Sequence, residues 1–233
     1  MQINIQPIEK REDSFPGTTL DVHSIFYTIQ GEGPLCGTPA VFIRLAGCNL
    51  QCPGCDTDYT SKRKIMSIGS IATAVNDLMP FDYGLVVITG GEPFRQNISP
   101  LCQSLLFNLG YVVQVETNGT LPPSEGLPAR VVIVCSPKAG KINHMIAARA
   151  DCYKYVLSHT SIALDGLPSL VLGHNATPHV ARPPEGYAGK VYLQPMDSQD
   201  SAENAHNVQA VVSSCMSYGY ILQLQIHKLI NLE

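Results

Sequence analysis

Three cysteines, Cys48, Cys52 and Cys55, lie close together in the sequence and follow a short apolar run. Pro53 and Gly54 lie between them and favour a tight loop, in which the three thiolates can converge on one inorganic centre. A [4Fe-4S] cluster held by three protein thiolates keeps one iron open, and that iron can bind a substrate or cofactor directly. The triad therefore predicts a reactive iron–sulfur centre.

A closed zinc site is the alternative for the same triad. Structural zinc takes four ligands, and no fourth cysteine or histidine lies next to these three in the sequence. Cys36 or His23 would have to complete such a site. A protein with zinc in this position would be a metal-binding interaction protein and not a catalyst.

The other cysteines are scattered along the chain, where a lone thiol usually behaves as a small buried hydrophobe. They are Cys36, Cys102, Cys135, Cys152 and Cys215. Their number and spacing do not suggest a secreted disulfide scaffold. We therefore expect free thiols in a reducing compartment, the cytoplasm.

Composition limits the partners of the chain. Its 233 residues are 45% hydrophobic, which is enough apolar material for one domain with a sizeable core. The formal net charge of -4 gives no basic field for a phosphate backbone, so we expect no nucleic-acid partner. No signal-peptide pattern and no long apolar run occurs, and we expect no membrane contact.

Short β-branched runs alternate with segments of helical periodicity. This alternation predicts a parallel α/β sheet that right-handed crossovers curl toward a barrel, with helices on its outer face. Polar and glycine-rich residues follow the runs, as expected for a site at the carboxyl ends of the strands. The expected strands are 41–47, 85–89, 111–117, 130–136, 153–158, 190–195 and 220–226; the expected helices are 67–79, 98–110, 142–150 and 201–219, with Ser67 and Ser201 as N-caps.

The spacing Cys48-x3-Cys52-x2-Cys55 is similar to the signature of the radical S-adenosylmethionine superfamily. Residues 89–93, TGGEP, resemble its GGE motif, in which backbone groups bind the methionine amino group. Adjacent glycines allow such a close approach, and Glu92 offers a carboxylate to an ammonium. The resemblance implies a partial (β/α) barrel of about six parallel strands with the site at their carboxyl ends. It also implies a [4Fe-4S] cluster and S-adenosylmethionine as cofactors, bound in part by Gly90, Gly91 and Glu92.

Further segments resemble the 7-carboxy-7-deazaguanine synthase family from about residue 21 onward. They include 25–33, IFYTIQGEG, 42–45, FIRL, and 225–228, QIHK. The resemblance implies ring contraction of 6-carboxy-5,6,7,8-tetrahydropterin with loss of ammonia, in 7-deazapurine (queuosine-type) biosynthesis. An arginine fork suits the substrate carboxylate, although a surface ion pair is the alternative for Arg44. The substrate-binding residues that it implies are Ile29, Gln30, Gly31, Glu32, Arg44, Thr89, His227 and Glu233.

Other matching segments imply the rest of the cofactor site. In residues 55–57, CDT, the family places Thr57 on a Mg2+ ion, which keeps most of its shell as water and substrate oxygens. The S-adenosylmethionine site that the resemblance implies comprises Cys55, Asp56, Gly90, Gly91, Glu92, Glu116, Asn118, Ser136, Pro137, Lys138, Gln194, Pro195, Met196 and Asp197.

The resemblance also implies partners and boundaries. A flavodoxin-type or ferredoxin-type donor must supply the electron, and a homodimer is expected. We interpret 1–233 as a single domain, with 1–20 as an N-terminal extension and 159–189 as a loop-rich insertion. An activase that makes a glycyl radical on a partner protein shares the cysteine spacing and is the competing enzyme hypothesis, although QGEG, CDT and QIHK argue against it.

Overall fold

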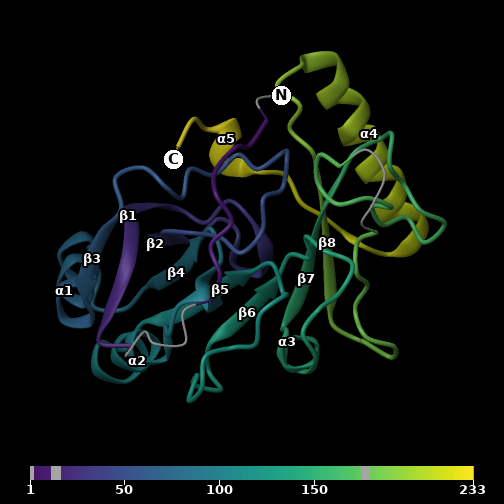
Figure 1. Ribbon diagram of the computed structural model, residues 1–233. Coiled ribbons are helices and arrows are strands. Elements are labelled where there is room, and N and C mark those ends of the chain that lie inside the picture. Colours follow the sequence, from purple (N-terminus) through teal and green to yellow (C-terminus); the bar gives the residue numbers. More distant parts are fainter. Residues whose placement is uncertain (1–2, 12–16, 175–178, 233) are drawn as a thin grey trace.

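The computed structural model describes residues 3–11, 17–174 and 179–232. These residues form one nine-stranded sheet in the order β3-β1-β2-β4-β5-β6-β7-β8-β9, which Figure 1 shows fanning from β3 on the left to β8 on the right. The strands are β1 Thr19–Ile29, β2 Pro39–Leu45, β3 Lys64–Ser67, β4 Leu85–Gly90, β5 Val112–Thr117, β6 Val132–Cys135, β7 Cys152–Leu157, β8 Lys190–Pro195 and β9 Ile221–Leu222.

The strands from β2 to β9 run parallel, as the sequence predicts. Two antiparallel strands were not expected: β1 pairs with β2, and β3 pairs with β1 at the sheet edge. The expected strand 220–226 is wrong in its second half, because pairing with β8 ends at Leu222 and a short helix begins at Ile226. The boundary expected at residue 20 falls inside β1.

The helices are α1 Ile68–Leu78, α2 Ser99–Gln103, α3 His144–Arg149, α4 Ser201–Tyr218 and α5 Ile226–Leu229, and a π-helical turn Ser104–Asn108 prolongs α2. Ser67 caps α1, because its hydroxyl accepts a hydrogen bond from the Ser70 amide at 3.1 Å. The cap of α4 is Asp200 and not Ser201: its carboxylate accepts from the amides of Ala202 and Glu203. A carboxylate at this position also complements the helix dipole.

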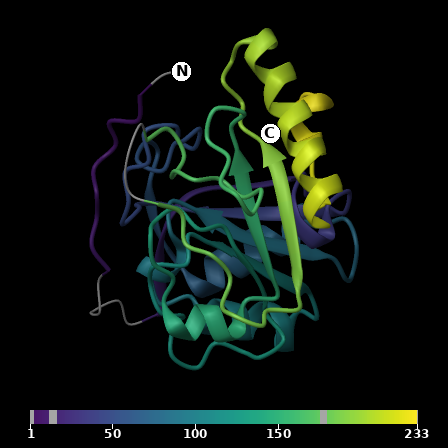
Figure 2. The same cartoon turned by 90° about the vertical axis from the view of Figure 1, so that its right-hand side faces the viewer.

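The two faces of the sheet have different roles. One face carries the main apolar core, in which Ile43 of β2 and Tyr153 of β7 pack with Ile71 of α1 and Val211 of α4. Figure 2 shows α4 running alongside β8 on this side. Because side chains alternate along a strand, the residues between these core positions point to the opposite, inner face. That face begins apolar, with Leu85 and Val87, and carries polar side chains nearer the carboxyl ends of the strands.

The residues of 159–189 that the structure describes contain turns and isolated bridges, Ile162 with Pro168 and Leu170 with His179. In the described part of the chain, no helix combines the length and the apolar character that crossing a bilayer requires.

Candidate active site

The cysteine triad lies in the loop that follows β2. Cys48 is buried, whereas Cys52 and Cys55 are partly accessible. Burial raises the pKa of Cys48 to about 12, and the charges of Glu92, Cys52 and Cys55 add to this effect. Three thiolates that repel one another in a partly buried loop need a compensating cationic centre, so the donor set fits an iron–sulfur cluster.

The spread of the three thiols argues against zinc. Tetrahedral coordination with Zn–S bonds of about 2.3 Å places the sulfurs about 3.8 Å apart. Among the described residues, the group whose metal-binding atoms lie within 4.8 Å of one another is His159, Glu203 and His206, and not the triad. The suggested fourth ligands also lie elsewhere. Cys36 is next to Gln223, and His23 contacts Ser24, Asp58 and Ser61.

The glycine pair of the GGE turn packs directly on the cluster loop. Gly90 has φ of 130°, and a Cβ there would lie 2.1 Å from the Leu45 carbonyl oxygen. A Cβ at Gly91 would lie 2.1 Å from the Gly47 carbonyl oxygen. The Glu92 amide donates to that same oxygen at 3.1 Å. The glycines are therefore required for contact between two loops of the protein itself, besides any approach to a ligand.

Glu92 is a buried link between β4 and β5. Its carboxylate accepts hydrogen bonds from the Phe94 amide at 3.0 Å, the Thr117 hydroxyl at 2.8 Å and the Asn118 amide at 2.8 Å. Burial raises the pKa of Glu92 to about 7, against the effect of these donors. The carboxylate is fully buried. These oxygens already accept three hydrogen bonds within the protein, and the contact between this carboxylate and an ammonium that the sequence suggested stays a prediction.

A second polar group lies on the inner face and brings together three residues predicted from sequence. The Gln30 amide donates to the Glu116 carboxylate at 3.0 Å. Lys154 of β7 forms ion pairs with Glu32 and, at 3.4 Å, with Glu116. Gln30 and Glu32 reach these strands because the chain crosses the inner face after β1.

Lys154 and Glu32 stabilise each other's charged forms. Burial by itself lowers the pKa of Lys154, but Glu116 and Glu32 outweigh it and raise that pKa above its ordinary value. Burial likewise raises the pKa of Glu32, yet Lys154 and Gln225 outweigh it and bring the pKa to about 2. The site thus holds a fixed carboxylate and a fixed ammonium in a region shielded from water.

The C-terminal segment closes on the same group. Gln225 donates to the Glu32 carboxylate at 2.5 Å, and Gln194 of β8 donates to it at 3.5 Å. The His227 ring lies against Gly31, where an added Cβ would be 1.9 Å from Nδ1. Glycine is therefore required at position 31, because any larger side chain would clash with the His227 ring.

The exposed rim joins the cluster loop to the end of β8. Lys228 donates to Asp56 at 3.1 Å and to Asp197 at 3.2 Å. The Thr57 hydroxyl lies 3.4 Å from the Asp56 carboxylate, so hard oxygen donors gather there. Lys138 donates to the Ser136 hydroxyl at 2.7 Å, and its charge lies near Cys52 and Asp56.

Arg44 and Thr89 form a separate pair of neighbours on β2 and β4, in register with each other. The Arg44 guanidinium lies 5.1 Å from the centre of the Phe26 ring, a cation–π contact. The choice between a substrate ligand and an ion pair for Arg44 stays a prediction.

The remaining predicted residues flank these groups. Asn118 donates to Asn49 at 2.9 Å beside the cluster loop. Ile29 ends β1, Pro137 is buried after β6, and Pro195 ends β8. Met196 follows β8, and its amide donates to the Leu157 carbonyl. Glu233 lies outside the described residues.

Several residues of the inner face were missed from sequence. Lys154 is the main one, and Gln114 and Gln223 accompany it. Gln225 belongs to the QIHK segment found from sequence, which gave it no role of its own. A charged residue at an inward position of an apolar strand was the available signal for Lys154.

Comparisons with known proteins agree with this geometry. Residues 29–111, which include the triad and the GGE turn, match the family described as a 4Fe-4S single cluster domain. The 7-carboxy-7-deazaguanine synthase of Rhodospirillum rubrum is 37% identical over 227 residues, covering 94% of this chain and 95% of the relative. That of Rickettsia prowazekii is 40% identical over 227 residues, covering 93% and 90%. The chain belongs to the 7-carboxy-7-deazaguanine synthase family.

A solved structure supports the fold of this family member. QueE from Escherichia coli superposes with a TM-score of 0.66 over 88% of this chain and 93% of the other, at 22% sequence identity. The partial barrel expected from the sequence is confirmed, with β1 and β3 as two antiparallel additions on one side of the sheet.

Proposed function

We propose that the chain is a radical S-adenosylmethionine enzyme that contracts the ring of 6-carboxy-5,6,7,8-tetrahydropterin to 7-carboxy-7-deazaguanine with release of ammonia. The observation that carries the proposal is the pair of sites described above. A three-thiol loop lies against a GGE turn, and a shielded group of one ammonium, Lys154, and two carboxylates lies on the inner face. Near full-length family membership supports the same reaction.

Cys48, Cys52 and Cys55 would hold the cluster, and the backbone of Gly90 and Gly91 would meet S-adenosylmethionine. When bound, these groups supply the one-electron chemistry that starts a radical reaction. The role of the chain is orientation and exclusion of water. Further cofactor contacts are proposed for Asp56, Glu92 through its backbone, Glu116, Asn118, Ser136, Pro137, Lys138, Gln194, Pro195, Met196 and Asp197.

The inner face would recognise the pterin. An ionised Glu32 accepts hydrogen bonds from ring N–H groups, and Lys154 keeps it ionised. The amide of Gln30 can donate to a ring carbonyl or accept from an amino group. Arg44 and His227 would meet the substrate carboxylate, with Thr89, Ile29 and Gly31 shaping the pocket.

Arg44→Ala should raise the KM for the carboxypterin by more than about tenfold, because leaving a shielded carboxylate unpaired costs roughly 2 to 5 kcal/mol. The KM for S-adenosylmethionine should stay nearly unchanged. Steady-state kinetics with each ligand varied in turn measures both values, with exposed Arg130→Ala as the control. An unaltered carboxypterin KM would remove Arg44 from the pocket.

We propose Thr57 as a Mg2+ ligand, since its hydroxyl is a hard oxygen beside the Asp56 carboxylate. Thr57→Ala should weaken the stimulation of activity by Mg2+ and leave the iron content and uncoupled S-adenosylmethionine cleavage largely intact. A Mg2+ titration of product formation tests this, with the exposed Thr160→Ala as the matched control. Identical titration curves for Thr57→Ala and the unmodified protein would contradict the assignment.

One assay tests the whole proposal. The anaerobic, reduced protein is mixed with S-adenosylmethionine, Mg2+ and 6-carboxytetrahydropterin, and the ultraviolet spectrum is followed for the 7-deazapurine. Ammonia is measured in the same reaction. The proposal fails if the reconstituted protein cleaves S-adenosylmethionine but leaves the pterin unchanged; that result would favour an activase of another protein.

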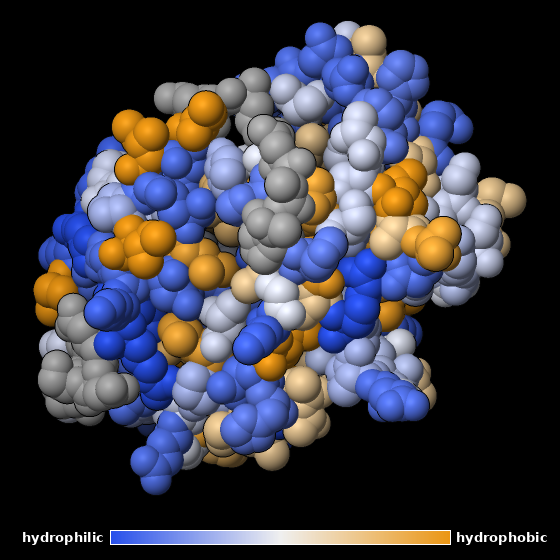
Figure 3. Space-filling model, turned by 45° about the vertical axis from the view of Figure 1, so that its right-hand side comes forward, coloured by the Kyte–Doolittle hydropathy of each residue, from blue (hydrophilic) through white to orange (hydrophobic). Residues whose placement is uncertain are grey.

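We also propose a flavodoxin-type or ferredoxin-type electron donor and a homodimer. The dimer rests on the family resemblance. The face in Figure 3 carries apolar side chains scattered among hydrophilic ones, a pattern that by itself marks no interface. Light scattering of the purified protein measures the mass directly, and a monomer would refute the dimer.

A further inference from the structure

The segment before β1 lies across the cluster loop. Its described residues alternate between partly buried and exposed positions from Ile3 to Pro7, as in an extended strand. The Asn4 amide donates to the Pro53 carbonyl at 3.0 Å, and the Asn4 side chain donates to the Cys52 carbonyl at 3.2 Å. Further along, the Glu9 amide donates to the Cys48 carbonyl at 2.7 Å. Two of the three triad residues are thus bonded through their backbone to this segment.

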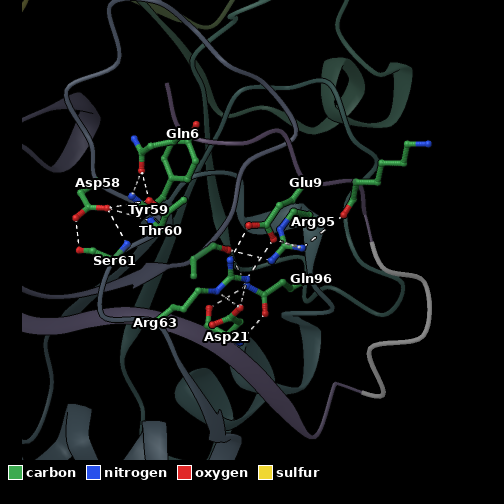
Figure 4. A network of polar contacts seen from close by, with 12 residues as sticks. Gln6, Glu9, Asp21, Asp58, Tyr59, Thr60, Ser61, Arg63, Arg95 and Gln96 are labelled. Carbon is green, nitrogen blue, oxygen red and sulfur yellow. Dashed lines mark hydrogen bonds and ion pairs between the residues drawn. The ribbon is translucent and has the colours of Figure 1, made fainter. Parts of the chain in front are cut away.

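Gln6 binds the far side of the same loop, as Figure 4 shows. Its side-chain amide donates to the Thr57 carbonyl at 2.8 Å. Its side-chain oxygen accepts from the Tyr59 amide at 2.8 Å and from the Thr60 hydroxyl at 3.0 Å. The backbone oxygen of Gln6 accepts from Gln51 at 2.6 Å. One side chain therefore holds three residues of the loop, Thr57, Tyr59 and Thr60.

Glu9 anchors the segment to the body of the sheet. Its carboxylate pairs with Arg63 at 2.6 Å and with the fully buried Arg95 at 3.3 Å. Arg95 also donates to the Ala46 carbonyl at 3.1 Å, immediately before the cluster loop. The anchor thus joins the end of the segment to the start of the loop (Figure 4).

The cluster loop has little regular structure of its own to hold it in place. Between Asn49 and Arg63, no helix or strand is formed by these described residues, so their backbone groups lack the regular partners of a sheet or helix. Backbone groups without protein partners bind water instead. Cys52 and Cys55, which belong to this loop, are themselves partly accessible to solvent.

We propose that residues 4–9, the N-terminal strap, are a positioning element that holds the cluster loop closed over the iron–sulfur site and slows loss of the cluster. The inference rests on the proposed assignment of the cluster to Cys48, Cys52 and Cys55. The strap acts through backbone carbonyls at Cys48, Cys52 and Thr57 and contributes no ligand to the metal.

The test compares Gln6→Ala with Ile5→Ala. Ile5 is the neighbouring strap residue and its side chain is 86% exposed, so the second variant is the matched control. Both proteins are reconstituted anaerobically, and iron and sulfide are counted. A chelator is then added, and the decay of the absorption band near about 400 nm is followed. Gln6→Ala should lose its cluster about five to ten times faster than Ile5→Ala and the unmodified chain, because the loop opens more often.

A second variant separates loop opening from general destabilisation. Gln6→Glu keeps an oxygen for the Tyr59 amide but places a second oxygen against the Thr57 carbonyl, so it should also release iron faster. Thermal unfolding of the metal-free proteins should be nearly the same for all of them. Release from both Gln6 variants at the unmodified rate would overturn the proposal. The proposal would also be overturned if the Gln6 variants released iron faster but their metal-free forms unfolded at a clearly lower temperature than the unmodified protein, because general destabilisation would then explain the faster release. A separate measurement tests the assignment of the cluster to the three cysteines: the assignment fails if the Cys52→Ala protein keeps its full iron content.

Discussion

Cys52→Ala should lose the iron–sulfur cluster and reduce S-adenosylmethionine cleavage to background. The triad has no spare thiol, since Cys36 lies beside Gln223 and away from the loop. Two remaining thiolates cannot complete the three-point attachment of a [4Fe-4S] cluster. Iron and sulfide analysis with electron paramagnetic resonance of the reduced protein measures the cluster, and release of methionine from S-adenosylmethionine measures the chemistry.

Cys215→Ser is the control for this variant. Cys215 belongs to α4 and packs into the main core, so its replacement should affect packing alone and leave the iron content intact. Full iron and activity in Cys52→Ala would refute the assignment of the cluster. Equal losses in both cysteine variants would point to damage of the fold.

Lys154→Met should destabilise the protein by about 3 to 5 kcal/mol, because it leaves the carboxylates of Glu32 and Glu116 shielded without their cation. For a chain of this length that corresponds to a fall in Tm of about 10 °C. The KM for the carboxypterin should rise as well, since Glu32 would no longer be held ionised. Lys190→Met, on the exposed start of β8, should change neither quantity. Calorimetry and steady-state kinetics provide the two measurements.

The destabilisation should depend on pH with a defined sign. The pKa of Glu32 falls from 4.5 to about 2 on folding, so its contribution is complete above pH 4.5 and is lost as the pH falls toward 2. Without Lys154, burial would instead raise that pKa, and the variant would recover stability as Glu32 is protonated. The difference in free energy of unfolding between the two proteins should therefore begin to shrink as the pH falls through the raised pKa of Glu32 in the variant, above pH 4.5, and should go on shrinking toward pH 2. A difference that is constant from pH 7 to pH 3 would contradict the ion pair.

The parallel core of the sheet could be predicted because its strands are continuous apolar runs between turn residues. The runs at β4, β5 and β8 agree with their observed bounds within a residue or two. β1 was harder to predict, because its sequence TLDVHSIFYTI alternates polar and apolar residues for only part of its length. It also overlaps the segment 25–33, which resembles a substrate-binding motif. β3 has four residues, too few for a pattern, and its pairing with β1 joins segments distant in the chain.

Local sequence motifs predicted where the site residues lie, but they did not predict the tertiary contacts that those residues make. The triad and the GGE turn were found because ligand spacing and adjacent glycines are local in sequence. That Gly91 must admit the Gly47 carbonyl, or that Glu92 is enclosed by Thr117 and Asn118, depends on tertiary contacts. Lys154 was missed for a related reason, since its two carboxylate partners lie 122 and 38 residues away.

The alternation of faces along β7 has a practical meaning for protein engineering. The side chains of Tyr153 and Tyr155 pack in the apolar core, whereas the side chain of Lys154 between them lies on the inner face. A mutant library that randomises the inward positions of β5 and β8, and keeps Lys154 and its partner Glu116, would sample new ligand specificities with little disturbance of the side that holds the helices. Deep mutational scanning should accordingly yield two interleaved tolerance profiles, one sensitive to side-chain volume and the other to hydrogen bonding and charge.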